Sequence, residues 1–366
     1  IGNGLQVTLN GSNGGSEGFS DLSVSVGDGT VLTLADTVLT GSTTLLTLGK
    51  NDTLILSGKS ALAGNSDAKG NLNPTVSVGG NLTIRGGGSL SVSAILNNAS
   101  FDVMGGSSVI LEQGTLVVIK EGLMGSDGGA FNAIGAGLTI KGGTFLGRTT
   151  SDNVPVIFAD RFDVSGGTVK VQALKSPAAV SAKSASFTGG RMMASGHSGN
   201  SAADSKAYYN EKAIPGLKAA GGAFDQPLPF GDLYVDDDYY GAVAYCLGKN
   251  YLNGTSSTAF SPDGSMTRAM FVTALYRIAG SPAVKGSSSF TDLKQSWYQN
   301  AVIWAVDKGI SGGTSATTFS PNTPLSREEA AVFLYRFASL SGKNTASTGT
   351  DARVPGAVSP WARTEV

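Results

Sequence analysis

The stretch LTIKGG (138–143) is followed along the chain by two stretches of the same kind, FDVSGG (162–167) and ASFTGG (185–190). In each one, apolar residues alternate with polar residues and a glycine pair follows. The glycine pairs begin at Gly142, Gly166 and Gly189, so they are 24 and 23 residues apart. Alternation with a period of two is typical of half-buried strands. Glycine pairs suit tight corners between such strands, because glycine readily adopts positive φ.

The same pattern extends outward over the first two hundred residues, as at Leu82–Ile84 and Phe101–Val103, with irregular early spacing and an insertion at 58–75. A self-similar period of about 20–24 residues without a helical pattern indicates a solenoid. We therefore predict a right-handed parallel β-helix over residues 1–200, in which inward side chains stack from rung to rung. An antiparallel β-sandwich of the immunoglobulin type is the alternative.

This region also resembles the parallel β-helical segments of large surface proteins from gut Firmicutes, some of which are described as carbohydrate-binding. Three stretches carry the resemblance: NLTIRGGGSLSV (81–92), GAGLTIKGGTFLG (135–147) and FDVSGGTVKV (162–171). The resemblance implies a β-helical binding or structural domain.

The composition of the 366-residue chain excludes several classes of protein. Glycine is abundant, with 52 residues, but follows no strict triplet, which excludes collagen. A net charge of -1 argues against a general nucleic-acid binder, whose surface would be basic. One cysteine, Cys246, and one histidine, His197, leave no internal disulfide and no Cys- or His-rich metal site, so we predict no metal and no cofactor. No apolar run is long enough for a membrane-spanning helix.

The aromatic residues divide the chain into two parts. Every Tyr and Trp lies at or beyond Tyr208, whereas the earlier part has only Phe. Such a shift predicts two domains, joined by a linker or irregular extension over residues 201–229. Residues 339–347, rich in serine, indicate a second and shorter linker.

Charged residues between 148 and 170 are the candidates for chemistry in the β region: Asp152, Asp160 and Asp163, with Arg148, Arg161 and Lys170. A glycoside hydrolase would need two of the carboxylates about 5–9 Å apart. We interpret them as ordinary surface charges and predict no catalytic residue. The absence of Tyr and Trp before Tyr208 also disfavours a sugar-stacking face. His197 is interpreted as a loop residue and Cys246 as a buried core thiol.

Two segments of the C-terminal part, 230–280 and 290–339, align with each other. Tyr239 matches Tyr298, and most matched pairs are separated by 59 residues. The apolar spacing predicts helices near 239–248, 267–279, 297–308 and 326–339. Gly309 and the matching Asn250 are expected at left-handed helix ends. Ser326 and Glu329 form a capping box, while the matching box at Thr267 is incomplete because Met270 replaces the glutamate.

These segments resemble S-layer homology repeats. The motifs are Phe-x-Asp at 230 and 290, a Tyr-Tyr or Trp-Tyr pair, an Ala-Val-x-[Tyr/Trp] helix, Phe-Ser-Pro, and a Thr-Arg-Ala or Ser-Arg-Glu motif before Leu-Tyr-Arg. The resemblance implies a helical spindle of three repeats. We assign residues 230–280 to repeat 1 and 281–340 to repeat 2. Residues 341–366 are assigned to a linker and the start of a truncated third repeat, with Trp361 matching Trp297. The family also implies secretion with a cleaved signal peptide.

The resemblance further implies noncovalent binding to a secondary cell-wall polysaccharide attached to peptidoglycan. It places Arg268 and Arg327 in grooves between repeats, where a guanidinium would bind an anionic group of the polymer, and lets Gly254 and Gly313 admit the ligand close to the backbone. A guanidinium can bind a carboxylate with two parallel hydrogen bonds. Met270 departs from the family motif, and so does the Thr-Ser-x-Thr turn.

The sequence therefore predicts a secreted bacterial surface protein, anchored to the cell wall by its repeats and displaying a β-helical domain without catalysis. Two alternatives remain at this point. One is a wall-anchored polysaccharide lyase or hydrolase that uses the β-helix, and the other is a self-assembling S-layer component. Glycans or other surface proteins are the expected partners of the β-helix, and no nucleic acid or membrane span is expected.

Overall fold

The computed structural model describes residues 1–11, 19–20, 22–65, 73–95, 99–122, 128–196, 217–219, 223–225, 228–343 and 345. The chain divides into two compact units. One comprises Ile1–Tyr240 with Ser256–Ala259, and the other comprises Gly241–Thr255 with Phe260–Val366. Each unit is described by itself.

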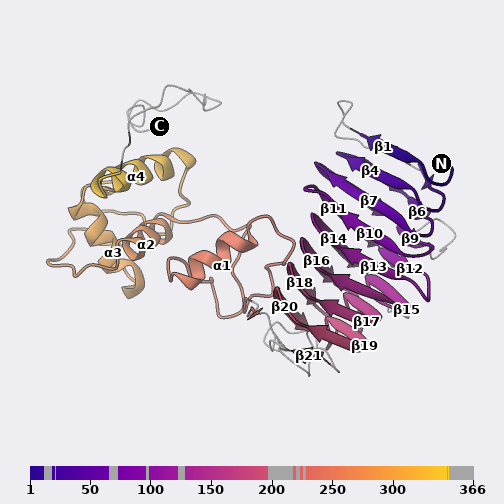
Figure 1. Ribbon diagram of the computed structural model, residues 1–366. Coiled ribbons are helices and arrows are strands. Elements are labelled where there is room, and N and C mark those ends of the chain that lie inside the picture. Colours follow the sequence, from indigo (N-terminus) through magenta and orange to yellow (C-terminus); the bar gives the residue numbers. More distant parts are fainter. Residues whose placement is uncertain are drawn as a thin grey trace. The chain divides into compact units, whose positions relative to one another are not determined.

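The first unit is a parallel β-solenoid (Figure 1), and its strands pair in parallel throughout the described residues. The strands are β1 (Gln6–Asn10), β2 (Phe19–Ser20), β3 (Val24–Ser25), β4 (Val31–Ala35), β5 (Val38–Gly41), β6 (Leu46–Leu48), β7 (Asp52–Ser57), β8 (Lys59–Gly64), β9 (Val76–Val78), β10 (Leu82–Arg85), β11 (Ser89–Ile95), β12 (Phe101–Val103), β13 (Ser108–Leu111), β14 (Thr115–Glu121), β15 (Phe131–Ile140), β16 (Thr144–Thr149), β17 (Ile157–Val164), β18 (Thr168–Ala173), β19 (Val180–Phe187), β20 (Arg191–Gly196), β21 (Leu217–Ala219) and β22 (Ala223–Phe224). The predicted solenoid is confirmed, and the antiparallel sandwich is excluded.

Two sheets run along the solenoid, one of 13 strands and one of nine. The larger sheet starts as two columns of short strands, β1-β4-β7-β10-β13 and β3-β6-β9-β12, which merge where β15 pairs with both β12 and β13. Early rungs therefore need three strands and later rungs only two. This explains the irregular early spacing and the regular spacing of the last three glycine pairs.

The core consists of side chains that occupy the same register in successive rungs. One row runs through Leu54, Ile84, Leu111, Ile140, Val164 and Phe187, and each of these residues is fully buried. Phe101 pairs with Phe131 in register, and their rings stack with centroids 5.1 Å apart. Because every rung adds apolar area to the same row, burial stabilises the stack in proportion to its length.

The glycine pairs are required by both conformation and space. Gly167 and Gly190 adopt positive φ values of 71° and 84°. A Cβ atom at either position would also lie 2.6 Å from the carbonyl oxygen of the corresponding glycine in the preceding rung. Only glycine fits a corner that is both left-handed and stacked on its copy.

The repeats supply four helices to the described structure: α1 (Tyr240–Gly248), α2 (Arg268–Ile278), α3 (Ser296–Asp307) and α4 (Arg327–Leu340). Their bounds agree with the predicted segments within two residues. Gly309 and Asn250 adopt positive φ values of 67° and 58°, as expected for left-handed helix ends. Aromatic and aliphatic side chains of α2, α3 and α4 form one core, which includes Val272, Tyr298, Val302, Trp304 and Phe333.

The predicted capping box at Ser326 is confirmed, but the expectation of an incomplete box at Thr267 was wrong. The Thr267 hydroxyl accepts a hydrogen bond from the Met270 amide (3.3 Å), and the Met270 sulfur accepts one from the Thr267 amide (3.5 Å). A thioether is a weak acceptor, yet it takes the place that the Glu329 carboxylate has in α4.

Three single-residue expectations have different outcomes. Cys246 is half-buried, not buried, because it lies on the partly exposed face of the short helix α1. His197 and Trp361 lie outside the described residues. Of the helices that the structure describes, none is both long and apolar enough to cross a membrane.

Candidate functional site

A cavity of about 490 Å³ opens in the helical unit beside α2. Its walls come from the loop after α1, the Phe-Ser-Pro turn, one face of α2 and the start of α3. It is lined by Tyr251, Leu252, Asn253, Gly254, Thr255, Phe260, Ser261, Pro262, Gly264, Ser265, Met266, Met270, Thr273, Arg277 and Trp297. Sugar and other small-ligand sites are commonly concave, largely apolar and equipped with a few polar groups, as this one is.

Arg277 gives the cavity its charge. Among the described residues that line it, Arg277 is the one ionisable basic group, and none is acidic. With the Asn253 amide oriented so that its nitrogen donates to the Leu252 carbonyl (2.8 Å), its oxygen accepts from Arg277 Nη2 (3.1 Å). The guanidinium is thus positioned by a neutral partner and retains its positive charge toward the cavity. Such a site favours an anionic ligand group.

Trp297 adds an aromatic face to the cavity. Its side chain is 47% exposed and packs edge-on against Tyr298, with ring centroids 4.8 Å apart. Its Nε1 donates to Gln295 Oε1 (2.5 Å), which fixes the orientation of the ring. A partly exposed indole of this kind offers an apolar face to a sugar ring while its polar edge stays hydrogen-bonded.

Arg268 does not lie on a groove surface. It is 4% exposed, and its guanidinium reaches from α2 into repeat 2. Nε donates to the Phe319 carbonyl (3.1 Å), Nη2 donates to the Gly312 carbonyl (2.8 Å), and Nη1 forms an ion pair with Glu329. The group also lies over the Phe319 ring, 5.0 Å from its centroid. The sequence placed this arginine in a groove between repeats as a ligand-binding residue, whereas in the structure repeat 2 covers it and holds its guanidinium through Glu329 and two carbonyl groups.

The other three predicted site residues occupy different surroundings. Gly254 lines the cavity. Arg327 is exposed at the first turn of α4. A Cβ atom at Gly313 would lie 2.4 Å from Phe290 Cε1 and 2.4 Å from the Ser315 carbonyl oxygen, so this glycine is needed for packing. The structure therefore brings Gly254 together with Arg277 and Trp297, not with Arg268.

Arg277, Asn253 and Trp297 were missed as site residues. Two of them stand in repeated motifs, Arg277 in Leu-Tyr-Arg and Trp297 in the Trp-Tyr pair. The repetition of these motifs was visible in the sequence, but the direction of their side chains was not.

The candidate acids of the solenoid each have a basic partner. Asp160 Oδ2 lies 2.8 Å from Lys183 Nζ, Asp163 lies 3.0 Å from Arg161, and Asp152 lies 3.7 Å from Lys175. The hydrogen bond from Lys183 and one from the Gly135 amide lower the pKa of Asp160. A general acid for glycoside hydrolysis needs a raised pKa, so Asp160 is unsuited to that role.

Comparison with known proteins identifies the helical part. The S-layer homology domain model matches residues 229–270 and 289–331. The Surface-layer 125 kDa protein of Lysinibacillus sphaericus is 33% identical over 123 residues, which is 33% of this chain and 10% of that protein. An Endoglucanase of Bacillus sp. (strain KSM-635) is 32% identical over 109 residues, 30% of this chain and 12% of that protein.

A third relative, the Cellulosome-anchoring protein of Acetivibrio thermocellus, is 29% identical over 118 residues, 31% of this chain and 26% of that protein. The chain thus spans about a quarter or less of the length of these relatives, and the endoglucanase matches only through its S-layer homology region. Residues 229–270 and 289–331 thus match S-layer homology domains, and this match together with the surface-layer relative indicates a cell-surface location.

Proposed function

We propose that the chain is a surface protein held noncovalently on the bacterial cell wall by its S-layer homology repeats, with the cavity of repeat 1 as a binding site for an anionic wall polysaccharide. The observation that carries this proposal is the combination of Arg277, Gly254 and Trp297 in one cavity without an acidic lining residue. Arg277 would bind the anionic substituent, Trp297 would pack against a sugar ring, and Gly254 would allow close approach to the backbone.

Arg268 and Arg327 have separate parts in this proposal. Arg268 acts indirectly, because it holds the start of α2 against repeat 2 and so keeps the cavity walls in place. Arg327 is exposed and offers the polymer a second contact on α4. Gly313 supports the packing of Phe290 in repeat 2.

The solenoid is proposed to display a surface and not to catalyse. Its candidate carboxylates are paired with lysine or arginine, and the resemblance of this chain to an endoglucanase is confined to the repeats. Incubation of the full chain with a panel of pectins and other glycans, scored for cleavage and for binding, tests this. Cleavage of any of them would contradict the display function.

Anchoring is tested by co-sedimentation of the full chain with isolated cell walls, before and after chemical removal of wall polysaccharide. We expect sedimentation with intact walls and its loss with stripped walls. Equal sedimentation with both would show that peptidoglycan itself, or nonspecific adsorption, holds the protein.

A further inference from the structure

The opening of repeat 1, residues Leu228–Tyr240, belongs to the same compact unit as the solenoid. It forms no strand, and Tyr240 is the first residue of α1. Nevertheless Phe230, Leu233 and Val235 are buried, with exposed fractions of 6%, 1% and 4%. Irregular segments are normally exposed, so something must cover these side chains.

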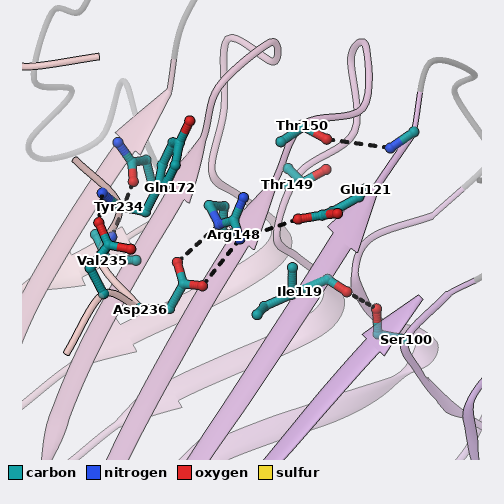
Figure 2. A network of polar contacts seen from close by, with 12 residues as sticks. Ser100, Ile119, Glu121, Arg148, Thr149, Thr150, Gln172, Tyr234, Val235 and Asp236 are labelled. Carbon is teal, nitrogen blue, oxygen red and sulfur yellow. Dashed lines mark hydrogen bonds and ion pairs between the residues drawn. The ribbon is translucent and has the colours of Figure 1, made fainter. Parts of the chain in front are cut away.

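The covering surface is the outer face of the nine-stranded sheet, at β16, β18 and β20. Arg148 of β16 and Gln172 of β18 are neighbours in register on that face. Arg148 Nε and Nη2 donate to the two oxygens of Asp236 at 3.0 and 3.3 Å. Nη2 also lies 3.2 Å from Glu121 of β14, and the guanidinium lies 4.5 Å from the centroid of the Tyr234 ring. Figure 2 shows Arg148 between the two carboxylates.

Gln172 binds the backbone of the same segment. Its Nε2 donates to the Leu233 carbonyl (3.2 Å), and its Oε1 accepts from the Val235 amide (3.3 Å). One side-chain amide thus pairs with the chain on both sides of Tyr234, much as a neighbouring strand would. Gln172 is 5% exposed, so both of its polar atoms are removed from water and both are satisfied.

Tyr240 closes the segment at its other end. The side chain is 5% exposed, and the ring lies 5.5 Å from Lys170 Nζ. Its hydroxyl donates to the Met193 sulfur (3.4 Å) and accepts from the Leu228 amide (3.2 Å). Lys170 and Met193 are neighbours in register on β18 and β20. Burial raises the pKa of Tyr240.

Repeat 2 provides the internal comparison, because its opening belongs to the other compact unit. Counted from the shared Phe-x-Asp motif, Val235 and Asp236 of repeat 1 correspond to Gln295 and Ser296 of repeat 2, and counted from Tyr239 and Tyr298, Tyr240 corresponds to Gln299. Gln295 and Ser296 are exposed and Gln299 is half-buried, whereas Val235 and Tyr240 are buried. The sequence of repeat 1 therefore departs from that of repeat 2 at the positions that contact the solenoid.

We propose that the outer face of β16, β18 and β20 is a specific docking surface for the opening of repeat 1, and that Arg148 is the residue that positions this segment. The positioning extends to the loop Ser256–Ala259, because the Gly231 amide donates to the Thr258 carbonyl (3.0 Å) within the same unit. The opening of the first repeat thus depends on the solenoid for its structure. The inference is independent of what the cavity binds.

Amide hydrogen exchange on the full chain tests the proposal, with the variants Arg148→Met and Asp236→Asn. Asp236→Asn leaves the solenoid sequence intact, so it tests the same contact even if Arg148→Met impairs folding of the solenoid. The matched control is Arg161→Met, which removes an exposed arginine of the same solenoid that is paired with Asp163. We expect exchange at residues 228–240 and 256–259 to rise at least tenfold in both variants, and to stay unchanged in the control.

Two further variants separate positioning from simple loss of packing. Arg148→Lys should restore only part of the protection, because an ammonium group cannot make the two parallel contacts with Asp236. The double variant Arg148→Met with Asp236→Asn should be no worse than Arg148→Met alone, because the two residues act through one contact. Unchanged exchange at 228–240 in both Arg148→Met and Asp236→Asn, or full protection with lysine, would overturn the proposal.

Discussion

The same recess exists in both repeats, but among the described residues a side chain fills it only in repeat 2. In repeat 2 the recess is formed by Gly312, Phe319 and Glu329, and the Arg268 guanidinium occupies it. The equivalent positions of repeat 1, found 59 residues earlier, are Asn253, Phe260 and Met270, and they line the open cavity. Repeat 2 has Glu329 at the position that binds the guanidinium, whereas repeat 1 has Met270 at the same position, where the recess is open.

This difference shows what repetition in a sequence does and does not specify. It specifies the local shape, since the turns and caps of the two repeats agree. Repetition does not specify which other part of the chain packs against each repeat. Arg268 and Arg327 hold the same place in aligned motifs, yet one is buried by the next repeat and the other is exposed.

The largest expected effect is the contrast between Arg268→Ala and Arg327→Ala. Removing Arg268 takes the ion-pair partner from Glu329 and a buried donor from two carbonyl groups, which we expect to destabilise the helical unit by about 3–5 kcal/mol. Arg327→Ala changes an exposed position and should stay within about 0.5 kcal/mol. Denaturant unfolding followed by far-ultraviolet circular dichroism measures both. Equal losses in the two variants would show that Arg268 is not a buried contact between repeats.

The next contrast concerns glycines. Gly313→Ala must displace Phe290 or the backbone at Ser315, and overpacking of this kind costs about 1–3 kcal/mol. Gly312→Ala is the matched control, because no atom lies within 4 Å of its added Cβ. Thermal unfolding of the full chain compares them. Equal melting temperatures for the two variants would show that the close packing at Gly313 does not limit which residue fits there.

The smallest expected effect comes from giving repeat 1 the acid that repeat 2 has. Met270→Glu should replace the weak thioether acceptor in the capping box of α2 by a carboxylate and stabilise the helix by about 0.3–1 kcal/mol. It also places a negative charge in the cavity, so binding to wall polysaccharide should weaken severalfold. Thermal unfolding and wall co-sedimentation measure the two effects. Binding that is unchanged or stronger would argue against an anionic ligand in this cavity.

Much of the fold could be predicted because the deciding interactions are local or repeat at a fixed interval. The glycine pairs beginning at Gly142, Gly166 and Gly189 fixed the rung register, and the caps at Ser326 and Gly309 fixed the helix ends. The alternation of apolar and polar residues did not indicate Lys120, whose side chain points inward from β14 and is fully buried. Burial lowers its pKa to about 8. Neighbouring Val117 and Ile119 point outward, so alternation alone did not mark the lysine as an inward residue.

The candidate site was less predictable because it depends on contacts across the repeats. Gly254, which the repeat motif singled out in the loop after the first helix, lines the cavity, and its contact with a ligand stays a prediction. Arg268 is buried because it contacts residues that lie 44 to 61 positions further along the chain. Asp236 and Arg148 are 88 positions apart in the chain, and no local sequence pattern predicts that they pair.

The central claim is that the cavity of repeat 1 binds an anionic wall polysaccharide through Arg277. Isothermal titration of the full chain with polysaccharide released from cell walls tests it most directly, with Arg277→Gln as the variant and Arg161→Gln as the control on the solenoid. Loss of a charge-paired contact should raise Kd at least tenfold for Arg277→Gln, while Arg161→Gln should bind like the unaltered chain. An unchanged Kd for Arg277→Gln would show that the polymer binds elsewhere and would contradict the account.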